Sequence, residues 1–124
     1  MVSTNFVRGI RGAATVDEDS AEQVGEAARE LLRVIVEQNQ LDVASIASVY
    51  FTVTGDLSAG FPAAGARQMP GWDLVPMLCA REMEVTGALA KCIRVLMHVN
   101  TTLRQDQIKH VYLRGAVNLR PDLA

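Results

Sequence analysis

Apolar and polar residues alternate along several stretches of the chain, and this pattern predicts β-strands. Residues 48–54 place two valines and a phenylalanine between threonines and a tyrosine, a period of two that is typical of a strand with one buried face. Residues 92–99 are apolar at most positions and predict the clearest strand. Shorter apolar runs predict further strands at residues 6–13, 73–78 and 110–113.

One long helix is predicted from residue 20 to about residue 38. Ser20, with Gln23 three positions later, has the form of a capping box, which satisfies backbone N–H groups at a helix start. The outer face of this segment carries acidic and basic residues three and four positions apart, as on a solvated helix surface. Shorter helical turns are expected after Asp42 and from Pro62. The apolar positions at helical spacing are Val24, Ala28, Leu31, Leu32 and Ile35.

These elements predict a β-sheet with one long helix on one side. The chain has 124 residues, of which 49% are hydrophobic, which suffices for one domain with a core but not for two comfortable ones. We therefore expect residues 1–124 to form a single domain. One long helix covers only one face of such a sheet, so the other face stays open, and association with further copies of the chain would cover it.

Composition and charge argue against several kinds of partner. The formal net charge is −2 and there is no basic tail or block, so the chain lacks the surface of a nucleic-acid-binding protein. No apolar stretch is long enough to cross a membrane, and the first five residues lack the features of a signal peptide. Cys79 and Cys92 match no zinc or redox motif and are expected to be free thiols. We expect a cytoplasmic protein with no nucleic-acid or membrane partner.

Two arginines stand where a strand needs no charge. Arg94 lies in the middle of the strand predicted at 92–99, and Arg11 lies in the glycine-flanked run 6–13. A guanidinium moved out of water without a partner is costly, so each arginine requires a nearby carboxylate or an anionic ligand. Ten of the twelve basic residues are arginine, which favours planar, bidentate recognition of carboxylates. An anion pocket is one interpretation, and a structural ion pair between Arg94 and Glu82 is the other.

The sequence gives little support to other kinds of catalysis. His98 and His110 are the only histidines and lie far apart, with no ligand-like carboxylate spacing around them, so no metal site is expected. Neither the cysteines nor the serines lie in a nucleophile motif, and the glycines form no phosphate-binding loop. What remains is a constellation of arginine and carboxylate residues with a cysteine and a tyrosine: Arg11, Arg67, Arg94, Glu82, Cys79 and Tyr112.

Short sequence words carry a more specific signal than composition does. In chain order they are Arg8-Gly9-Ile10-Arg11-Gly12-Ala13, Asp56-Leu57, Phe61-Pro62-Ala63, Gly71-Trp72, Cys79 with Glu82-Met83, Val85-Thr86-Gly87, Lys91-Cys92-Ile93-Arg94-Val95, Gln105-Asp106-Gln107-Ile108, His110-Val111-Tyr112-Leu113 and Leu119-Arg120-Pro121-Asp122-Leu123. Their number, order and spacing closely resemble the monofunctional bacterial chorismate mutases of the trimeric, pseudo-α/β-barrel class.

This resemblance implies a mixed-sheet α+β subunit that assembles as a homotrimer, with active sites in the clefts between subunits. It also implies conversion of chorismate to prephenate, the branch step toward phenylalanine and tyrosine. This [3,3] sigmatropic rearrangement is unimolecular and needs no proton transfer, nucleophile, metal or cofactor. Catalysis then rests on holding the substrate in its reactive conformation and on stabilising negative charge at the ether oxygen.

The resemblance also implies a role for each matching residue. Arg94 would donate to the ether oxygen of the breaking bond and to a substrate carboxylate, while Arg11 and Tyr112 would hold the side-chain carboxylate. Glu82 and Cys79 would meet the ring hydroxyl. The pocket wall and the C-terminal segment that covers it would be formed by Phe61, Ala63, Arg67, Leu78, Leu119 and Arg120.

One position departs from the family, because relatives often carry a lysine after Phe-Pro-Ala and this chain has Ala64. One cation at the rim is therefore missing, and electrostatic capture of the dianionic substrate is expected to be weaker. Two other functions remain open at this point: a non-catalytic trimer that binds a dicarboxylate, and an imine or enamine hydrolase on a similar trimer. Turnover of chorismate separates the three.

Overall fold

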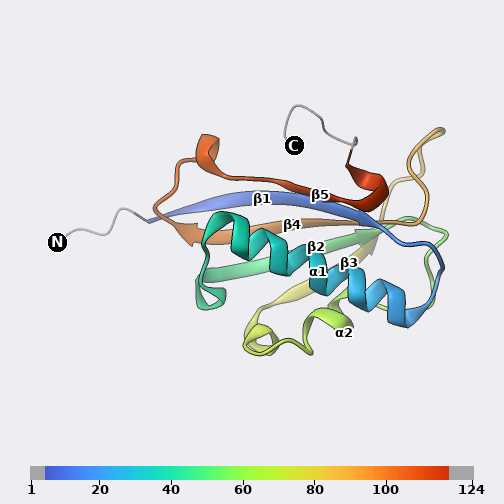
Figure 1. The fold of residues 1–124 in the computed structure, drawn as a ribbon, viewed down its shortest axis with the longest axis horizontal. Helices are drawn as coiled ribbons and strands as arrows, with labels where there is room; N and C mark the ends of the chain where they lie inside the picture. Colours follow the sequence, from blue (N-terminus) through green and yellow to red (C-terminus); the bar gives the residue numbers. More distant parts are fainter. Residues whose placement is uncertain (1–4, 118–124) are drawn as a thin grey trace.

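The structure is a computed structural model that describes residues 5–117, and Figure 1 shows their arrangement. The strands are β1 (Phe6–Thr15), β2 (Ile46–Val53), β3 (Met77–Arg81), β4 (Cys92–Thr101) and β5 (Val111–Leu113). The α-helices are α1 (Ala21–Asn39) and α2 (Pro62–Ala66), and short 3-10 turns join several of these elements. Within the described residues, no helix combines the length and the apolar character needed to cross a membrane.

The five strands form one mixed sheet in the order β3-β2-β4-β1-β5. Strand β4 is central and runs antiparallel to both β1 and β2, whereas β5 pairs with β1 and β3 pairs with β2 in parallel. The predicted α+β class is therefore confirmed. The backbone of β4 is therefore hydrogen-bonded on both sides.

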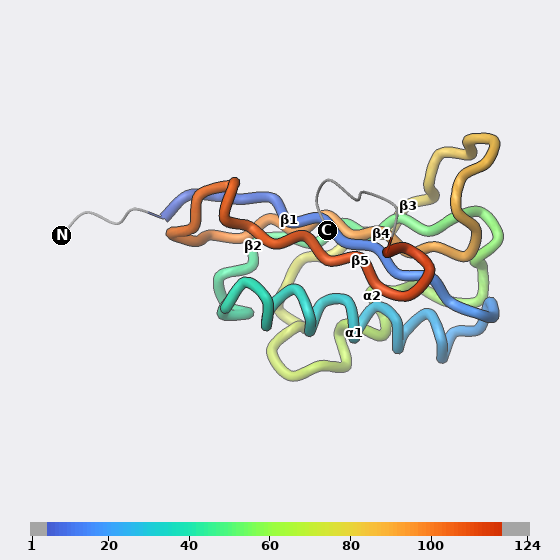
Figure 2. The backbone as a smooth tube through the Cα atoms, turned by 45° about the horizontal axis from the view of Figure 1, so that its top comes forward, coloured from blue at the N-terminus to red at the C-terminus, as the bar shows by residue number. Residues whose placement is uncertain are grey.

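Both α-helices lie on the same side of the sheet, as Figure 2 shows. Helix α1 begins after Ser20, whose hydroxyl oxygen accepts a hydrogen bond from the Gln23 backbone N–H at 3.1 Å. The Gln23 side chain accepts instead from the N–H groups of Asp17 and Glu18, so only half of the predicted capping box forms. These bonds fix the turn that leads from β1 into α1.

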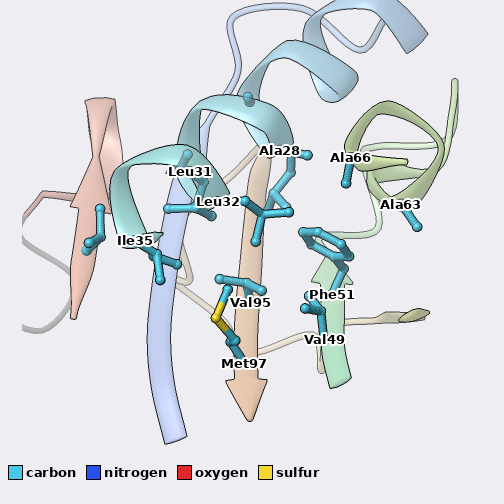
Figure 3. Close-up of a cluster of buried hydrophobic side chains, with 14 of the residues drawn as sticks. Ala28, Leu31, Leu32, Ile35, Val49, Phe51, Ala63, Ala66, Val95 and Met97 are labelled. Atoms are coloured by element: carbon cyan, nitrogen blue, oxygen red, sulfur yellow. The ribbon is translucent and has the colours of Figure 1, made fainter. Parts of the chain in front are cut away.

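The hydrophobic core fills the space between α1 and the sheet (Figure 3). Leu31, Leu32 and Ile35 of α1 are fully buried against strand residues that include Phe51 of β2 and Met97 of β4. The residues predicted at helical spacing are the ones that contact the sheet, because residues three and four apart share one face of a helix. Burial of this apolar surface is the main stabilising term of the fold.

Two glycines allow α2 to pack closely on α1. A side chain at Gly65 of α2 would collide with the backbone of Gly25 on α1. The Arg29 side chain of α1 adds a hydrogen bond to the Gln68 amide oxygen at 3.1 Å, just after α2. This contact fixes α2 beside the edge strand β3, and with it the segment that begins at Phe61.

The strand predicted at residues 73–78 is wrong at its start. Residues Trp72–Leu74 form a 3-10 turn, and β3 begins only at Met77 and continues to Arg81. Gly71 precedes the turn with a φ of 85°, a left-handed conformation that glycine adopts without strain. Leu74 in this turn is exposed and Val75 just after it is buried, so the first apolar residues of the predicted run belong to a turn rather than to a strand.

The second face of the sheet carries no helix among the described residues. Four large apolar side chains on this uncovered face are between 40% and 65% exposed: Val7, Tyr50, Leu78 and Leu96. The open face predicted from the sequence is thus present in the subunit. Residues 118–124, which include the C-terminal residues expected to cover the pocket, lie outside the described residues.

Candidate active site

Arg94 lies at the centre of the uncovered face. The strand register pairs it with Thr52 of β2 on one side and with Ala13 of β1 on the other, and Ala13 in turn pairs with Tyr112 of β5. Paired residues on neighbouring strands point to the same face of a sheet. The register therefore places the Arg94 guanidinium and the Tyr112 phenol in one row across the sheet, with only Ala13 between them.

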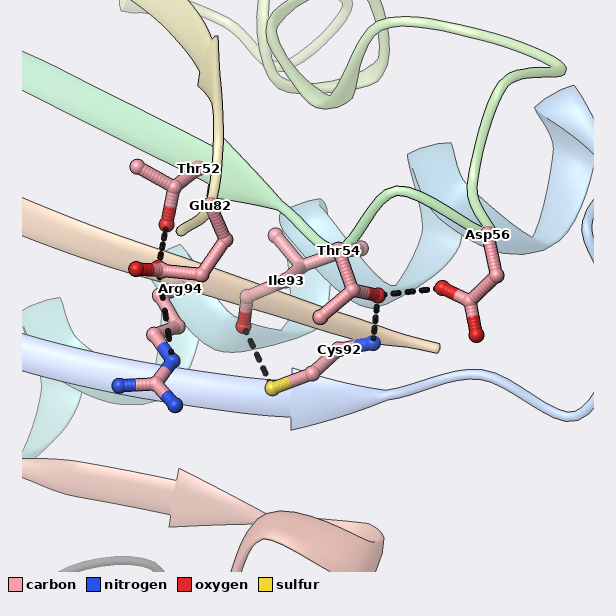
Figure 4. Close-up of polar contacts among 7 residues, drawn as sticks. All are labelled: Thr52, Thr54, Asp56, Glu82, Cys92, Ile93 and Arg94. Atoms are coloured by element: carbon pink, nitrogen blue, oxygen red, sulfur yellow. Dashed lines mark hydrogen bonds and ion pairs between the residues drawn. The ribbon is translucent and has the colours of Figure 1, made fainter. Parts of the chain in front are cut away.

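Glu82 approaches Arg94 without forming a full hydrogen bond to it. The Arg94 Nε lies 3.6 Å from the Glu82 Oε2, whereas the Thr52 hydroxyl donates to that same oxygen at 2.6 Å (Figure 4). Hydrogen bonds between a guanidinium and a carboxylate are usually about 2.7–2.9 Å long. The ion pair between Arg94 and Glu82 is therefore present, but it is stretched.

Two polar atoms on this row have no hydrogen-bond partner among the described residues. They are the Arg94 Nε and the Tyr112 hydroxyl, and both are buried. Nearly all buried polar groups in folded proteins are hydrogen-bonded, so each such atom requires an explanation. Two such donors in one row of the sheet are suited to bind a ligand that carries hydrogen-bond acceptors.

Arg11 lies on the same face, two residues before Ala13 along β1 and opposite Leu96 of β4. Its side chain is partly buried, and its backbone N–H donates to the His110 Nδ1 at 2.9 Å. The structure therefore places Arg11, Glu82, Arg94 and Tyr112 on one face of the sheet. We call these four residues the face cluster.

A second group of predicted site residues lies at the sheet edge. Phe61, Ala63, Arg67, Leu78 and Cys79 border a cavity of about 250 Å³ between α2 and β3, and we call them the edge cluster. Cys79 pairs with the core residue Phe51 and so points to the helix side of the sheet, opposite to Arg94. The cluster is otherwise open, with the Phe61 ring 70% exposed and Arg67 exposed.

The predicted site residues thus fall into two groups within one subunit. The sheet turns Cys79 to one face and Glu82 to the other, although the resemblance implies that both meet the same ring hydroxyl. Leu119 and Arg120, expected in the segment that covers the pocket, lie outside the described residues. Ala64 is exposed on α2, next to the edge cluster.

The base of the face cluster is held by hydrogen bonds at the start of β4. The Thr54 hydroxyl donates to Asp56 at 2.5 Å and accepts from the Cys92 N–H (Figure 4). The Asp56 carboxylate also accepts from the Lys91 N–H. The bonds from Thr54 and from the Lys91 backbone hold the pKa of Asp56 below its usual range. Burial raises the pKa of the Cys92 thiol, and the nearby Arg94 offsets this only in part. Cys92 is thus a neutral packing residue.

The histidines do not form a metal site. The His98 Nδ1 is bonded to the Ser48 hydroxyl at 3.1 Å and its ring meets Tyr50 edge to face, while His110 accepts from the Arg11 backbone. Within residues 5–117, no three histidine, cysteine, aspartate or glutamate side chains gather closely enough to hold a metal ion.

Comparison with known proteins decides the family. The model of chorismate mutase type I matches residues 7–123. The chain belongs to the type I chorismate mutase family. It is 48% identical over 119 residues to chorismate mutase AroH of Bacillus subtilis, a match that covers 96% of this chain and 94% of the relative. It is 53% identical over 119 residues to chorismate mutase AroH of Thermus thermophilus, covering 95% and 97% respectively.

A solved structure agrees with this assignment. Chorismate mutase from Clostridium thermocellum has a TM-score of 0.84 to this chain at 48% sequence identity, and the match covers 87% of this chain and 96% of that one. The resemblance inferred from the sequence words is therefore confirmed for the family and the subunit fold. Thr52 of this chorismate mutase is not among the residues predicted for the site, because only the pairing of β2 with β4 brings its hydroxyl beside Glu82 and Arg94.

Proposed function

We propose that this chorismate mutase rearranges chorismate to prephenate in a cleft formed by the face cluster of one subunit and the edge cluster of another. Membership of the family and about 50% identity to two proteins named chorismate mutase establish the isomerase activity. They do not favour the dicarboxylate-binding trimer or the imine and enamine hydrolase. The composition of the cleft and the roles of its residues are our proposal.

The main support for this proposal is the pair of buried donors at Arg94 and Tyr112, which have no hydrogen-bond partner within residues 5–117. The substrate carries two carboxylates and an ether oxygen that becomes more negative as its C–O bond breaks. Arg94 donates to that oxygen and to one carboxylate, and its fixed place on the central strand means that little reorganisation is needed in the transition state. Arg11 and Tyr112 bind the side-chain carboxylate and hold the substrate in a compact conformation in which the two reacting carbons approach.

The ring hydroxyl of the substrate is bound by Glu82 and Cys79. Glu82 accepts from the hydroxyl through the carboxylate oxygen that Thr52 leaves free, and Cys79 contacts it from the edge cluster. Because these two residues point to opposite faces of the sheet within one subunit, they meet one hydroxyl only when the edge cluster comes from a second copy. Phe61, Ala63, Arg67 and Leu78 then form the far wall, and Leu119 and Arg120 cover it.

A homotrimer is the assembly that we propose. The uncovered face exposes Val7, Tyr50, Leu78 and Leu96, which is a large apolar area for a subunit to leave in water. A ring of three copies joined through unlike surfaces would bury this face and place each edge cluster beside a neighbouring face cluster. The match over residues 7–123 supports a single domain over residues 1–124, and two free cysteines are consistent with a cytoplasmic protein.

The test of the mechanism is turnover of chorismate across the pH range 6–9 in H₂O and D₂O. Because no residue moves a proton, we expect the rate of the chemical step to be nearly constant over this range and nearly equal in the two solvents. A bell-shaped profile together with a large solvent isotope effect would show that proton transfer limits the step and that the proposed mechanism is wrong.

The assembly is tested by light scattering on the active protein. We expect the mass of three subunits, and we expect activity per subunit to fall on dilution below the dissociation constant of the trimer. A monomer with full activity would contradict the proposed cleft between subunits.

A further inference from the structure

Thr52 donates to Glu82 of the face cluster but has no role of its own in the proposed mechanism. We infer that Thr52 is a positioning residue, whose hydroxyl holds the Glu82 carboxylate away from Arg94 and thereby keeps the guanidinium free for the substrate. This inference rests on the proposed role of Arg94.

The distances at Glu82 Oε2 support this role. The oxygen accepts from the Thr52 hydroxyl at 2.6 Å and lies 3.6 Å from the Arg94 Nε, beyond the length of a hydrogen bond. A free arginine and carboxylate at this separation would close to form a shorter, charge-assisted bond. The hydroxyl therefore holds the Glu82 carboxylate at a distance from the guanidinium. The Arg94 Nε remains without a hydrogen-bond partner among the described residues.

The backbone fixes both partners of this hydrogen bond. Thr52 lies within β2 and is paired with Ala80 of β3 and with Arg94 of β4. Glu82 follows the last residue of β3, and its N–H donates to the Val53 carbonyl at 2.8 Å. Threonine is branched at Cβ, so few rotamers are open to it and its hydroxyl keeps one direction. The carboxylate is thus held by a donor that cannot easily follow it toward Arg94.

Loss of the hydroxyl has a definite consequence for binding. In a Thr52→Val variant, Glu82 closes on Arg94 and the two form a direct ion pair in the free enzyme. Substrate must then break this pair before it binds. The added free energy is the same for the bound substrate and for the transition state. A uniform cost of this kind raises KM and leaves kcat nearly unchanged.

The experiment is steady-state kinetics of Thr52→Val and Thr52→Ser with chorismate. We expect Thr52→Val to raise KM by about tenfold with less than about a threefold change in kcat, and Thr52→Ser, which keeps a donor, to stay within about threefold of the wild type in KM. Ser48→Ala is the matched control, because it removes a hydroxyl from the same face of β2 that bonds to His98 instead. An unchanged KM in Thr52→Val, or an equal rise in Thr52→Ser, would overturn the inference.

A double-mutant cycle separates positioning from a structural role. In a Glu82→Ala background the carboxylate is absent, so adding Thr52→Val should change KM by less than about twofold. An undiminished tenfold effect in that background would show that Thr52 acts otherwise than through Glu82. Thr52→Ala repeats both measurements if the valine variant does not form the native assembly.

A crystal structure of Thr52→Val tests the inference without any turnover. We expect the distance from the Arg94 Nε or a terminal nitrogen to the Glu82 carboxylate to shorten to hydrogen-bond length, about 2.7–3.0 Å. A distance that stays near the wild-type value of 3.6 Å would overturn the inference even if chorismate turnover were normal. Failure of the wild type to turn over chorismate would instead count against the proposed function alone.

Discussion

The two faces of the sheet are built from the same strands, but packing accounts for the side chains of only one of them. Along β4, Ile93, Val95 and Met97 point toward α1 and are at most 4% exposed, whereas the residues between them point to the uncovered face. Packing explains every side chain of the first set. It does not explain Arg94, whose charge lies beside a carboxylate that it does not fully bind. One face of the sheet therefore forms the core of the subunit, and the other carries the candidate site.

The largest expected effect comes from breaking the packed face. Phe51→Ala removes a ring that is 1% exposed in the core and should lower the free energy of unfolding by about 3–5 kcal/mol. Urea unfolding checks this value. At low temperature, where the variant remains assembled, kcat should stay within a few-fold of the wild type, because Phe51 faces away from Arg94. A loss below about 1 kcal/mol would show that this face is less well packed than the structure indicates.

On the uncovered face, Arg94→Lys should have the opposite effect, a large loss of activity with little loss of stability. Lysine keeps the charge but loses the planar fork, so it cannot address the ether oxygen and a carboxylate together. Loss of one preorganised donor typically costs on the order of 10²–10³ in rate, or about 2.7–4 kcal/mol, and the effect should fall mainly on kcat. Single-turnover kinetics measure the rate of the chemical step, and thermal unfolding measures the stability of the variant separately.

Citrulline at position 94 is the control that separates charge from shape. It keeps the planar fork without the charge, and we expect it to be severely impaired as well, because the ether oxygen gains negative charge in the transition state. If folded Arg94→Lys retained near-normal turnover, Arg94 would be a structural partner of Glu82, which is the alternative that the sequence left open.

A smaller effect is expected at Cys79, which lies in the edge cluster. Its proposed contact with the ring hydroxyl is a neutral hydrogen bond, for which a contribution of about 0.5–1.5 kcal/mol is typical. Cys79→Ala should therefore lower kcat/KM by roughly tenfold or less. Complete loss of activity in a variant with native secondary structure and assembly would indicate a covalent role for the thiol.

The smallest effect concerns the loop that joins β1 to α1, outside both clusters. The Ala59 and Ser58 N–H groups donate to Asp19 and hold the pKa of this carboxylate below its usual value. A depressed pKa means that the carboxylate stabilises the fold above its usual pKa of about 3.9 and loses this contribution as pH falls through the lower, folded value. Asp19→Asn should be less stable than the wild type at pH 7, and the difference should shrink near pH 3. A difference that is constant with pH would contradict this assignment.

Local patterns in the sequence predict most of the fold. The long helix, the strand at 92–99 and the uncovered face follow from periodicity, because the spacing of apolar residues directly reflects which side chains are buried. The strand predicted at 73–78 is wrong at its start because these residues begin in a turn, and periodicity does not distinguish a short turn from a short strand.

The candidate site is only partly contained in the sequence. An arginine within a predicted strand is unusual and can be recognised from the sequence. The short segments shared with the family supply the remaining residues. The pairing of Thr52 with Arg94, and the opposite directions of Cys79 and Glu82, depend on strand register and on where β3 ends. Such long-range pairing is set by the whole sheet, so no local pattern reveals it.

Mixing two impaired variants shows whether each cleft needs two subunits. Arg94→Ala disables the face cluster and Arg67→Ala disables the edge cluster. Mixed subunits that are unfolded and refolded together in equal amounts should recover about one quarter of the wild-type activity, because one cleft in four combines two intact clusters. The same variants refolded separately and then combined are the control and should stay inactive. No recovery in mixed trimers of native mass would show that both clusters act within a single subunit, and the proposed cleft between subunits would be wrong.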